Sequence, residues 1–189
     1  MAEITALIDA NVFYAMATTD IVLETAKSGL FRARWTDAIH DEWMENLLRN
    51  NPSLVRDRLV KRRAAMNNAI RDCLVTGYEP MIPTLSLPDR KDRHVFAAAI
   101  VGGCDAIVTF NLRHFPTRAL APLGIAAVHP DTFLVERFDA NEGAFLGCVK
   151  KCRERLMNPP RIVDDHLARL AKVGLPVLAS RLDQHKGLL

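Results

Sequence analysis

The stretch LPDRKDRHVFAAAIVGGCDAIVTFNLRHFP, residues 87–116, decides the fold that the sequence predicts. Asp89 and Asp92 stand before a short apolar helix, which a pair of glycines ends. A strand is expected over residues 105–109, and it leads directly into Asn111. Polar groups should therefore gather where a strand ends and a helix begins. An open α/β sheet places its functional site at that position.

The N-terminal segment shows the same pattern of an apolar run followed by an acidic side chain. Residues 6–8 are apolar without interruption, Asp9 and Asn11 follow, and helical spacing begins at residues 12–17. Because the run is continuous rather than alternating, the strand should be covered on both faces, as in a parallel sheet. Asp9 then lies at the carboxyl end of this strand, either as a helix N-cap or as a functional carboxylate.

A second acidic position lies on a helix expected over residues 38–49. Ile39, Trp43 and Leu47 recur at helical spacing and give this helix one buried stripe. Glu42 lies about 60° around the helix from Ile39, at the margin of the stripe rather than opposite it. Glu42 is therefore a candidate site residue, although pairing with a basic neighbour is an equally good explanation at this stage.

The chain divides into a part that alternates strands with helices and a part that is only helical. We predict a three-layer α/β/α sandwich around a central parallel sheet for residues 1–138, and a helical C-terminal extension for residues 139–189. The other expected elements are strands over 33–36 and 125–128, an edge-like segment over 81–83, a long helix over 53–74, and C-terminal helices over 140–157, over 161–173 and from 174 onward.

The composition sets limits on compartment and partners. The net charge of +3 and the pI near 8.8 permit a polyanionic partner without requiring one. No secretory signal is recognisable at the N-terminus, and no apolar run approaches the roughly 20 residues that span a bilayer. The four cysteines lack zinc-site spacing and are expected as reduced thiols. We expect a soluble, cytoplasmic protein with no membrane association.

Basic side chains cluster within eight residues of the helix over 53–74. A solvated helix face is the usual explanation of such a run. Contact with nucleic-acid phosphates is the alternative, and it gains weight beside a nuclease site. The candidates for RNA contact are Arg56, Lys61, Arg62 and Arg63.

Four carboxylates map to one edge of the predicted sheet: Asp9, Glu42, Asp89 and Asp92. Carboxylates held close together repel one another and raise each other's pKa values unless a cation neutralises them. A set of oxygen ligands suits Mg²⁺ or Mn²⁺. Such a site can activate water and stabilise the charge of a phosphoryl displacement.

Three motifs in this order resemble the PIN-domain family of ribonucleases, the fold of VapC-type toxins. They are LIDANVF at the N-terminus, IHDEWMENLL around Glu42, and DRKDRHVFAAAIVGGCDAIVTFNLRHFP, and the resemblance covers about residues 4–138. It implies that Asp9, Glu42 and Asp92 are metal ligands, with Asp89 as an additional acid. The helical C-terminus is similar to an extension found in some VapC-like toxins.

The sequence departs from the family pattern after Thr109, where a further acid is frequent. Asn111 stands there and supplies a carbonyl oxygen without a charge, and His114 follows where another acid is often found. We therefore expect either a one-metal site or a weak second metal site that is filled only together with the substrate. Asn111 stays a candidate catalytic residue, and Asn11, Thr109 and His114 are candidate polar residues of the site. His114 either contacts metal or phosphate or caps its loop, and Thr109 either bonds a ligand acid or caps its strand.

The resemblance implies a Mg²⁺- or Mn²⁺-dependent endoribonuclease that acts as a toxin, with a cognate antitoxin and a homodimer as expected partners. A catalytically weakened PIN-fold module that binds RNA or protein is the alternative, because of Asn111 and His114. A phosphatase of the DxDxT type is disfavoured, since Asn11 occupies the position of its second aspartate.

Overall fold

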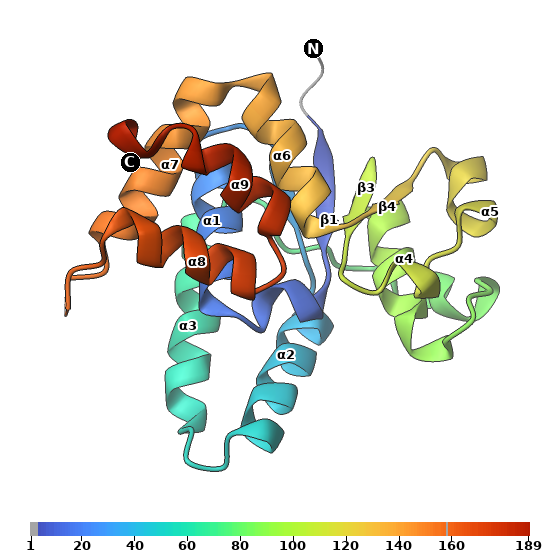
Figure 1. The fold of residues 1–189 in the computed structure, drawn as a ribbon. Helices are drawn as coiled ribbons and strands as arrows, with labels where there is room; N and C mark the ends of the chain where they lie inside the picture. The colour runs from blue at the N-terminus through green and yellow to red at the C-terminus, as the bar shows by residue number, and fades with distance from the viewer. Residues whose placement is uncertain (1–3, 158) are drawn as a thin grey trace.

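The structure is a computed structural model that describes residues 4–157 and 159–189, and its centre is a parallel sheet (Figure 1). The four strands are paired in the order β2-β1-β3-β4, and every pair is parallel. Their bounds are Thr5–Ile8 for β1, Arg32–Arg34 for β2, Ala106–Val108 for β3 and Ala126–Val128 for β4. The predicted parallel sheet within an α/β/α sandwich is confirmed, and the carboxyl ends of β1 and β3 lie side by side.

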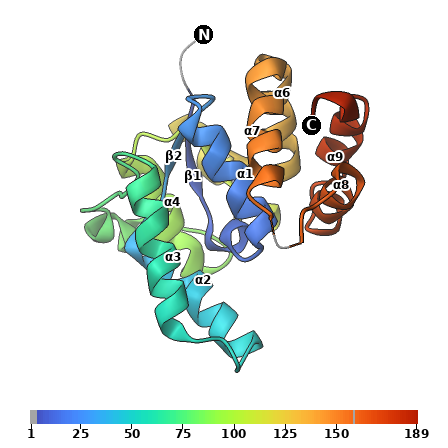
Figure 2. The same ribbon diagram turned by 90° about the vertical axis from the view of Figure 1, so that its left-hand side faces the viewer.

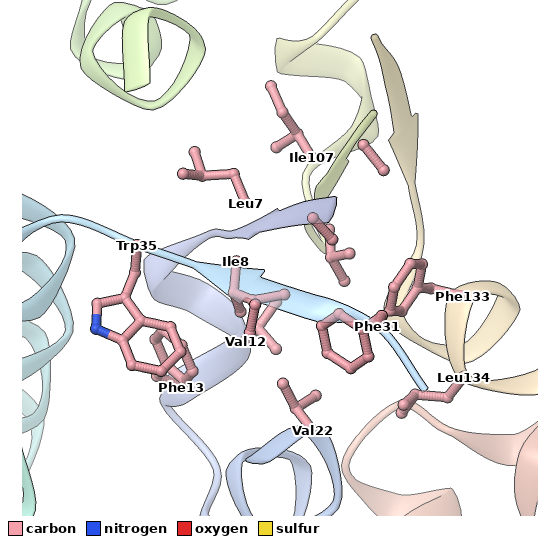
Figure 3. Packing of buried hydrophobic residues seen from close by; sticks show 14 of the residues in the cluster. Leu7, Ile8, Val12, Phe13, Val22, Phe31, Trp35, Ile107, Phe133 and Leu134 are labelled. Atoms are coloured by element: carbon pink, nitrogen blue, oxygen red, sulfur yellow. The ribbon is translucent and has the colours of Figure 1, made fainter. Parts of the chain in front are cut away.

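The two central strands are covered on both faces, as their continuous apolar runs predict. All residues of β3 are buried, and residues 6–8 of β1 have no exposed surface. Figure 3 shows Leu7 and Ile8 on opposite sides of β1, with Ile8 on the side of Phe31. Helix α4 (Arg93–Val101) packs against β1 and β3 and buries residues 95–99, which confirms the predicted enclosed helix.

The other layer contains α1 (Met16–Lys27) together with the C-terminal helices (Figures 1 and 2). These helices are α6 (Pro130–Ala140), α7 (Glu142–Glu154), α8 (Val163–Lys172) and α9 (Pro176–Asp183). Phe31, before β2, meets Phe133 of α6 edge to face, with ring centroids 4.9 Å apart. One hydrophobic core runs from the sheet into α7, α8 and α9. The C-terminal helices are thus joined to the sandwich by continuous packing.

Helices α2 (Asp37–Asn50) and α3 (Arg56–Ala69) project together from the sandwich (Figure 1). Thr36 caps α2 by accepting a hydrogen bond from the backbone of Ile39 at 3.1 Å. Asn67 of α3 accepts from the indole of Trp35 at 2.8 Å, and its Oδ1 lies 2.8 Å from Nε2 of His40. This polar network fixes α3 against the strand edge and against α2.

Several expected elements differ in kind or in length. Residues 81–83 belong to a 3-10 helix, η2 (Glu79–Thr84), because its two prolines lack the N–H groups that strand pairing needs. The helix expected over 12–17 is a 3-10 turn, η1 (Ala10–Phe13), followed by α1. The helix expected over 140–157 is α7, which begins at Glu142 after the extended backbone of Asn141, φ −157°. Helix α6 before it was not among the expected elements. Helix α3 is shorter at both ends than the expected 53–74.

The remaining short helices are η3 (Arg90–Asp92), η4 (Leu112–His114), α5 (Thr117–Leu120), η5 (Ala121–Leu123) and η6 (Lys186–Leu188). Within the residues that the structure describes, none of the helices combines the length and the apolar character that a membrane crossing requires.

Candidate active site

Asp9 is the central side chain of the site, and its surroundings hold it in one orientation. It follows β1, caps η1 and is only 4% exposed. Its Oδ1 accepts from the backbone N–H of Ala10 at 2.7 Å. Its Oδ2 accepts from the Asn11 amide and from the Thr109 hydroxyl, both at 2.6 Å. Asp9 is therefore both a helix cap and a fixed acidic group, so the two interpretations of the sequence are compatible.

The pKa of Asp9 lies well above that of an ordinary aspartate. Burial raises it from 3.8 to about 6, the hydrogen bond from Thr109 opposes the shift, and the charges of Glu42 and Asp92 add to it. The three acids therefore interact electrostatically, although they come from three distant segments of the chain. Ionisation of Asp9 costs free energy in this buried, acidic environment unless a positive charge lies nearby.

Asn11 and Thr109 form a frame that connects β1 to β3. The Asn11 amide also donates to the Thr109 hydroxyl oxygen at 3.0 Å, and its carbonyl accepts from the backbone N–H of Phe110 at 3.1 Å. The backbone N–H of Asn111 donates to the Thr109 hydroxyl oxygen at 3.0 Å. The Thr109 hydroxyl thus donates a hydrogen bond to Asp9, which is the first of the two roles considered for it, bonding an acid of the site. The exposed Asn111 meets this frame through its backbone.

A second group of ligands lies across the same sheet edge. Asp89, Asp92 and His114 each place one potential ligand atom within 4.8 Å of the others. Nδ1 of His114 lies 2.9 Å from Oδ2 of Asp92, but neither atom makes a well-aligned hydrogen bond within the described residues. Burial raises the pKa of Asp92, while His114 opposes that shift and Asp89 adds to it. His114 is therefore placed as a potential ligand rather than only as a loop cap.

Glu42 lies on α2 with its side chain 46% exposed, which agrees with its predicted place at the margin of the apolar stripe. Its carboxylate lies 3.6 Å from Nε2 of His94, in the first turn of α4. His94 was not among the candidate residues predicted from the sequence. Its position two residues after Asp92, at the start of the helix that begins at the sheet edge, was the available signal.

These residues fit a divalent cation. Asp89, Asp92 and His114 bring one potential ligand atom each within 4.8 Å of one another, close enough for one cation to contact all three. Burial is the main cause of the raised pKa values of Asp9 and Asp92, and the charges of neighbouring acids add to both shifts. Carboxylates with one imidazole suit Mg²⁺ or Mn²⁺, and the imidazole suits Mn²⁺ better.

The structure gives the basic residues of α3 different surroundings. Arg62 donates to the carbonyl of Phe13 and to the Thr19 hydroxyl at 2.5 and 2.6 Å, and its guanidinium stacks over Trp43 at 4.6 Å. Burial lowers the pKa of Arg62 to about 10. Arg62 thus has a packing role, which the sequence did not reveal.

The other three basic residues lie nearer the solvent. Arg63 pairs with Asp37 and Asp41 at 2.7 and 3.0 Å, and Arg56 pairs with Glu45 at 2.7 Å. Lys61 is exposed. RNA contact by this helix stays a prediction.

Comparison with known proteins finds a matching family model for the N-terminal part of the chain and another for the C-terminal part. Residues 130–184 match the VapC50 C-terminal domain, and the chain is 38% identical over 93 residues to a Mycobacterium tuberculosis protein named "Putative ribonuclease VapC50". That alignment covers 49% of this chain and 54% of the relative, so it spans about half the length of the curated relative. No solved structure matches significantly. Residues 5–113, more than half of the chain, match the PIN domain, and the chain therefore belongs to the PIN domain family.

Proposed function

We propose that the protein is a Mg²⁺- or Mn²⁺-dependent endoribonuclease. The observation that carries this proposal is the electrostatic interaction of Asp9 with Glu42 and Asp92 at one sheet edge, where burial raises the pKa of Asp9 and the charges of the two other acids raise it further. The name of the Mycobacterium relative, a ribonuclease, supports RNA as the substrate. Clustered acids of this kind are suited to hold a cation that contacts a phosphate.

The side chains divide into ligands and supports. Asp9, Asp92, Asp89 and His114 are the residues that would hold the cation, with Glu42 facing the same space. When bound, Mg²⁺ or Mn²⁺ supplies Lewis-acid stabilisation of a phosphodiester and an activated water. Thr109 and Asn11 hold the Asp9 carboxylate by two bonds of 2.6 Å and so limit its rotation. Such supports typically change metal affinity or activity about 10–100-fold when removed.

The biological role that we propose is that of a toxin whose cognate antitoxin covers the site. The match of residues 130–184 to the VapC50 C-terminal domain, and the 38% identity over 93 residues to the relative named VapC50, support this role. A homodimer is part of the same proposal. The exposed Lys61 of α3 and its neighbours Arg56 and Arg63 are proposed as contacts for the RNA backbone.

The test is cleavage of a structured RNA pool by the full-length protein with Mn²⁺, with Mg²⁺ and with EDTA. We expect metal-dependent cleavage that Asp9→Asn lowers at least about 100-fold. Glu42→Gln and Glu45→Gln form a matched pair, because both side chains lie on α2 with exposures of 46% and 52%. Only Glu42→Gln should lose cleavage. Equal activity of the two variants would contradict the proposal.

The alternative function, a weakened RNA-binding module, gives a different result in the same experiment. Such a module would bind the RNA pool equally well with and without EDTA and would cleave it in neither condition. Asn111→Asp would then restore the missing negative charge at the site. If this variant cleaved RNA, the missing catalytic activity of the wild type would be due to the asparagine at position 111.

A further inference from the structure

A cavity lined by polar and apolar side chains lies on the other side of α1 from the sheet, between the start of α1 and α8, which contact each other. It has a volume of about 130 Å³, room for roughly four water molecules. Residues of the sandwich and of the C-terminal helices line it together, among them Met16, Asp20, Cys152, Arg161, His166 and Arg169. The candidate active site uses none of these residues.

His166 is the residue that points to a ligand. It is 5% exposed, and neither of its ring nitrogens has a hydrogen-bond partner within the described residues. Buried polar atoms in folded proteins are nearly always paired, with protein groups, with ordered water or with a ligand. One ring nitrogen of a neutral imidazole donates and the other accepts. The molecule that fills this cavity therefore has to offer a hydrogen-bond acceptor to His166.

The charges around the cavity favour an anion. Arg161 and Arg169 line it, and with burial and Arg153 they lower the pKa of His166 to about 4. Asp20 is the acid that lines the cavity, together with the two arginines Arg161 and Arg169. The positive charges thus outnumber the negative one.

A metal ion fits the cavity poorly. Burial raises the pKa of the Cys152 thiol to about 12, so a metal would have to displace a firmly held proton to bind this sulfur. Within the described residues, the cysteine, the histidine and the aspartate of this cavity do not bring three ligand atoms within 4.8 Å of one another.

We propose that the cavity between α1 and α8 is a binding site for a phosphate group, held by the guanidinium groups of Arg161 and Arg169 and by the imidazole of His166. Arginine is well suited to phosphate, since its planar fork donates two parallel hydrogen bonds. The phosphate comes either from an RNA strand or from free phosphate. This proposal does not depend on the nuclease activity, because it uses different side chains from the candidate active site.

The direct test is a titration of the full-length protein with inorganic phosphate in EDTA, followed by NMR of the histidine ring nitrogens. EDTA keeps the acidic site free of metal, so that its carboxylates repel phosphate. We expect saturable shifts of the His166 signals, which His166→Gln identifies by their loss. Arg169→Gln should weaken phosphate binding about tenfold or more. The matched control is Lys172→Gln, on the same helix but outside the cavity, which should bind like the wild type.

Two short RNA oligonucleotides, one with a 5′-phosphate and one with a 5′-hydroxyl, separate the sources of the phosphate. Arg169-dependent binding of both would assign an internal phosphodiester, and binding of the phosphorylated one alone would assign a terminal phosphate. Binding of inorganic phosphate alone would assign the free ion. Absence of any shift at His166 with all three probes, or equal phosphate affinity in Arg169→Gln and in the wild type, would overturn the proposal.

Discussion

The buried carboxylate of Asp9 should make the metal-free protein less stable as the pH rises. Its pKa is raised from 3.8 to about 6 in the folded state, chiefly by burial. Between these two values the folded protein keeps a proton that the unfolded chain has released. The free energy of unfolding therefore falls as the pH increases through this window, and it stays low above about pH 6.

The size of this effect follows from the shift in pKa. A shift of roughly two units corresponds to about 3 kcal/mol, because each unit is worth about 1.4 kcal/mol. About 2 kcal/mol of this loss in unfolding free energy occurs between pH 4.5 and 7.5. The remainder occurs below pH 4.5, where Asp9 of the unfolded chain becomes ionised. Asp9→Asn removes the titration. The variant also places an amide against the Asn11 amide, but that cost is independent of pH.

The assay is urea unfolding in EDTA at several pH values between 4.5 and 7.5, for the wild type, for Asp9→Asn and for the control Asp41→Asn. Asp41 is an exposed acid on α2, paired with Arg63 at 3.0 Å. The difference in unfolding free energy between wild type and Asp9→Asn should change by about 2 kcal/mol over this range. Equal pH profiles of these two proteins would refute the reasoning. Mg²⁺ at 100 times its dissociation constant should add about 2.7 kcal/mol to the wild type at pH 7.5, and much less to Asp9→Asn.

Three further perturbations test the packing around the site. Gly174→Ala places a Cβ 2.7 Å from Cε1 of Phe110 at a backbone φ of +94°. It should lower the free energy of unfolding, measured in urea, by about 1–3 kcal/mol. The control Gly143→Ala has open space around it and should not destabilise the protein. Phe133→Ala should cost about 3–5 kcal/mol in the same assay, because its ring is fully buried. Truncation after Phe138 should give an insoluble or dye-binding product, since the core continues into α7, α8 and α9.

The sheet was predictable because burial on both faces leaves a direct signal in the sequence. Continuous apolar runs mark β1 and β3, and each run is followed by a side chain that the site uses, Asp9 or Thr109. Glu42 was recognisable from helical geometry alone, as an acid at the margin of a buried stripe.

The rest of the site depends on contacts between segments distant in the chain, and local spacing does not determine these. His114 and Asp92 meet through the conformations of two 3-10 turns, η3 and η4, which carry no periodic apolar signal. Arg62 is sequestered by the carbonyl of Phe13, 49 residues away. The cavity around His166 exists only because α8 folds back onto α1.

The C-terminal helices therefore affect the candidate active site without contributing a ligand to it. Phe110 follows Thr109 directly, and its backbone N–H holds Asn11, which in turn holds Asp9. The Phe110 ring lies against His129, with centroids 5.0 Å apart, and against Gly174 at the end of α8. A shift of α8 would move this ring and loosen the frame around Asp9.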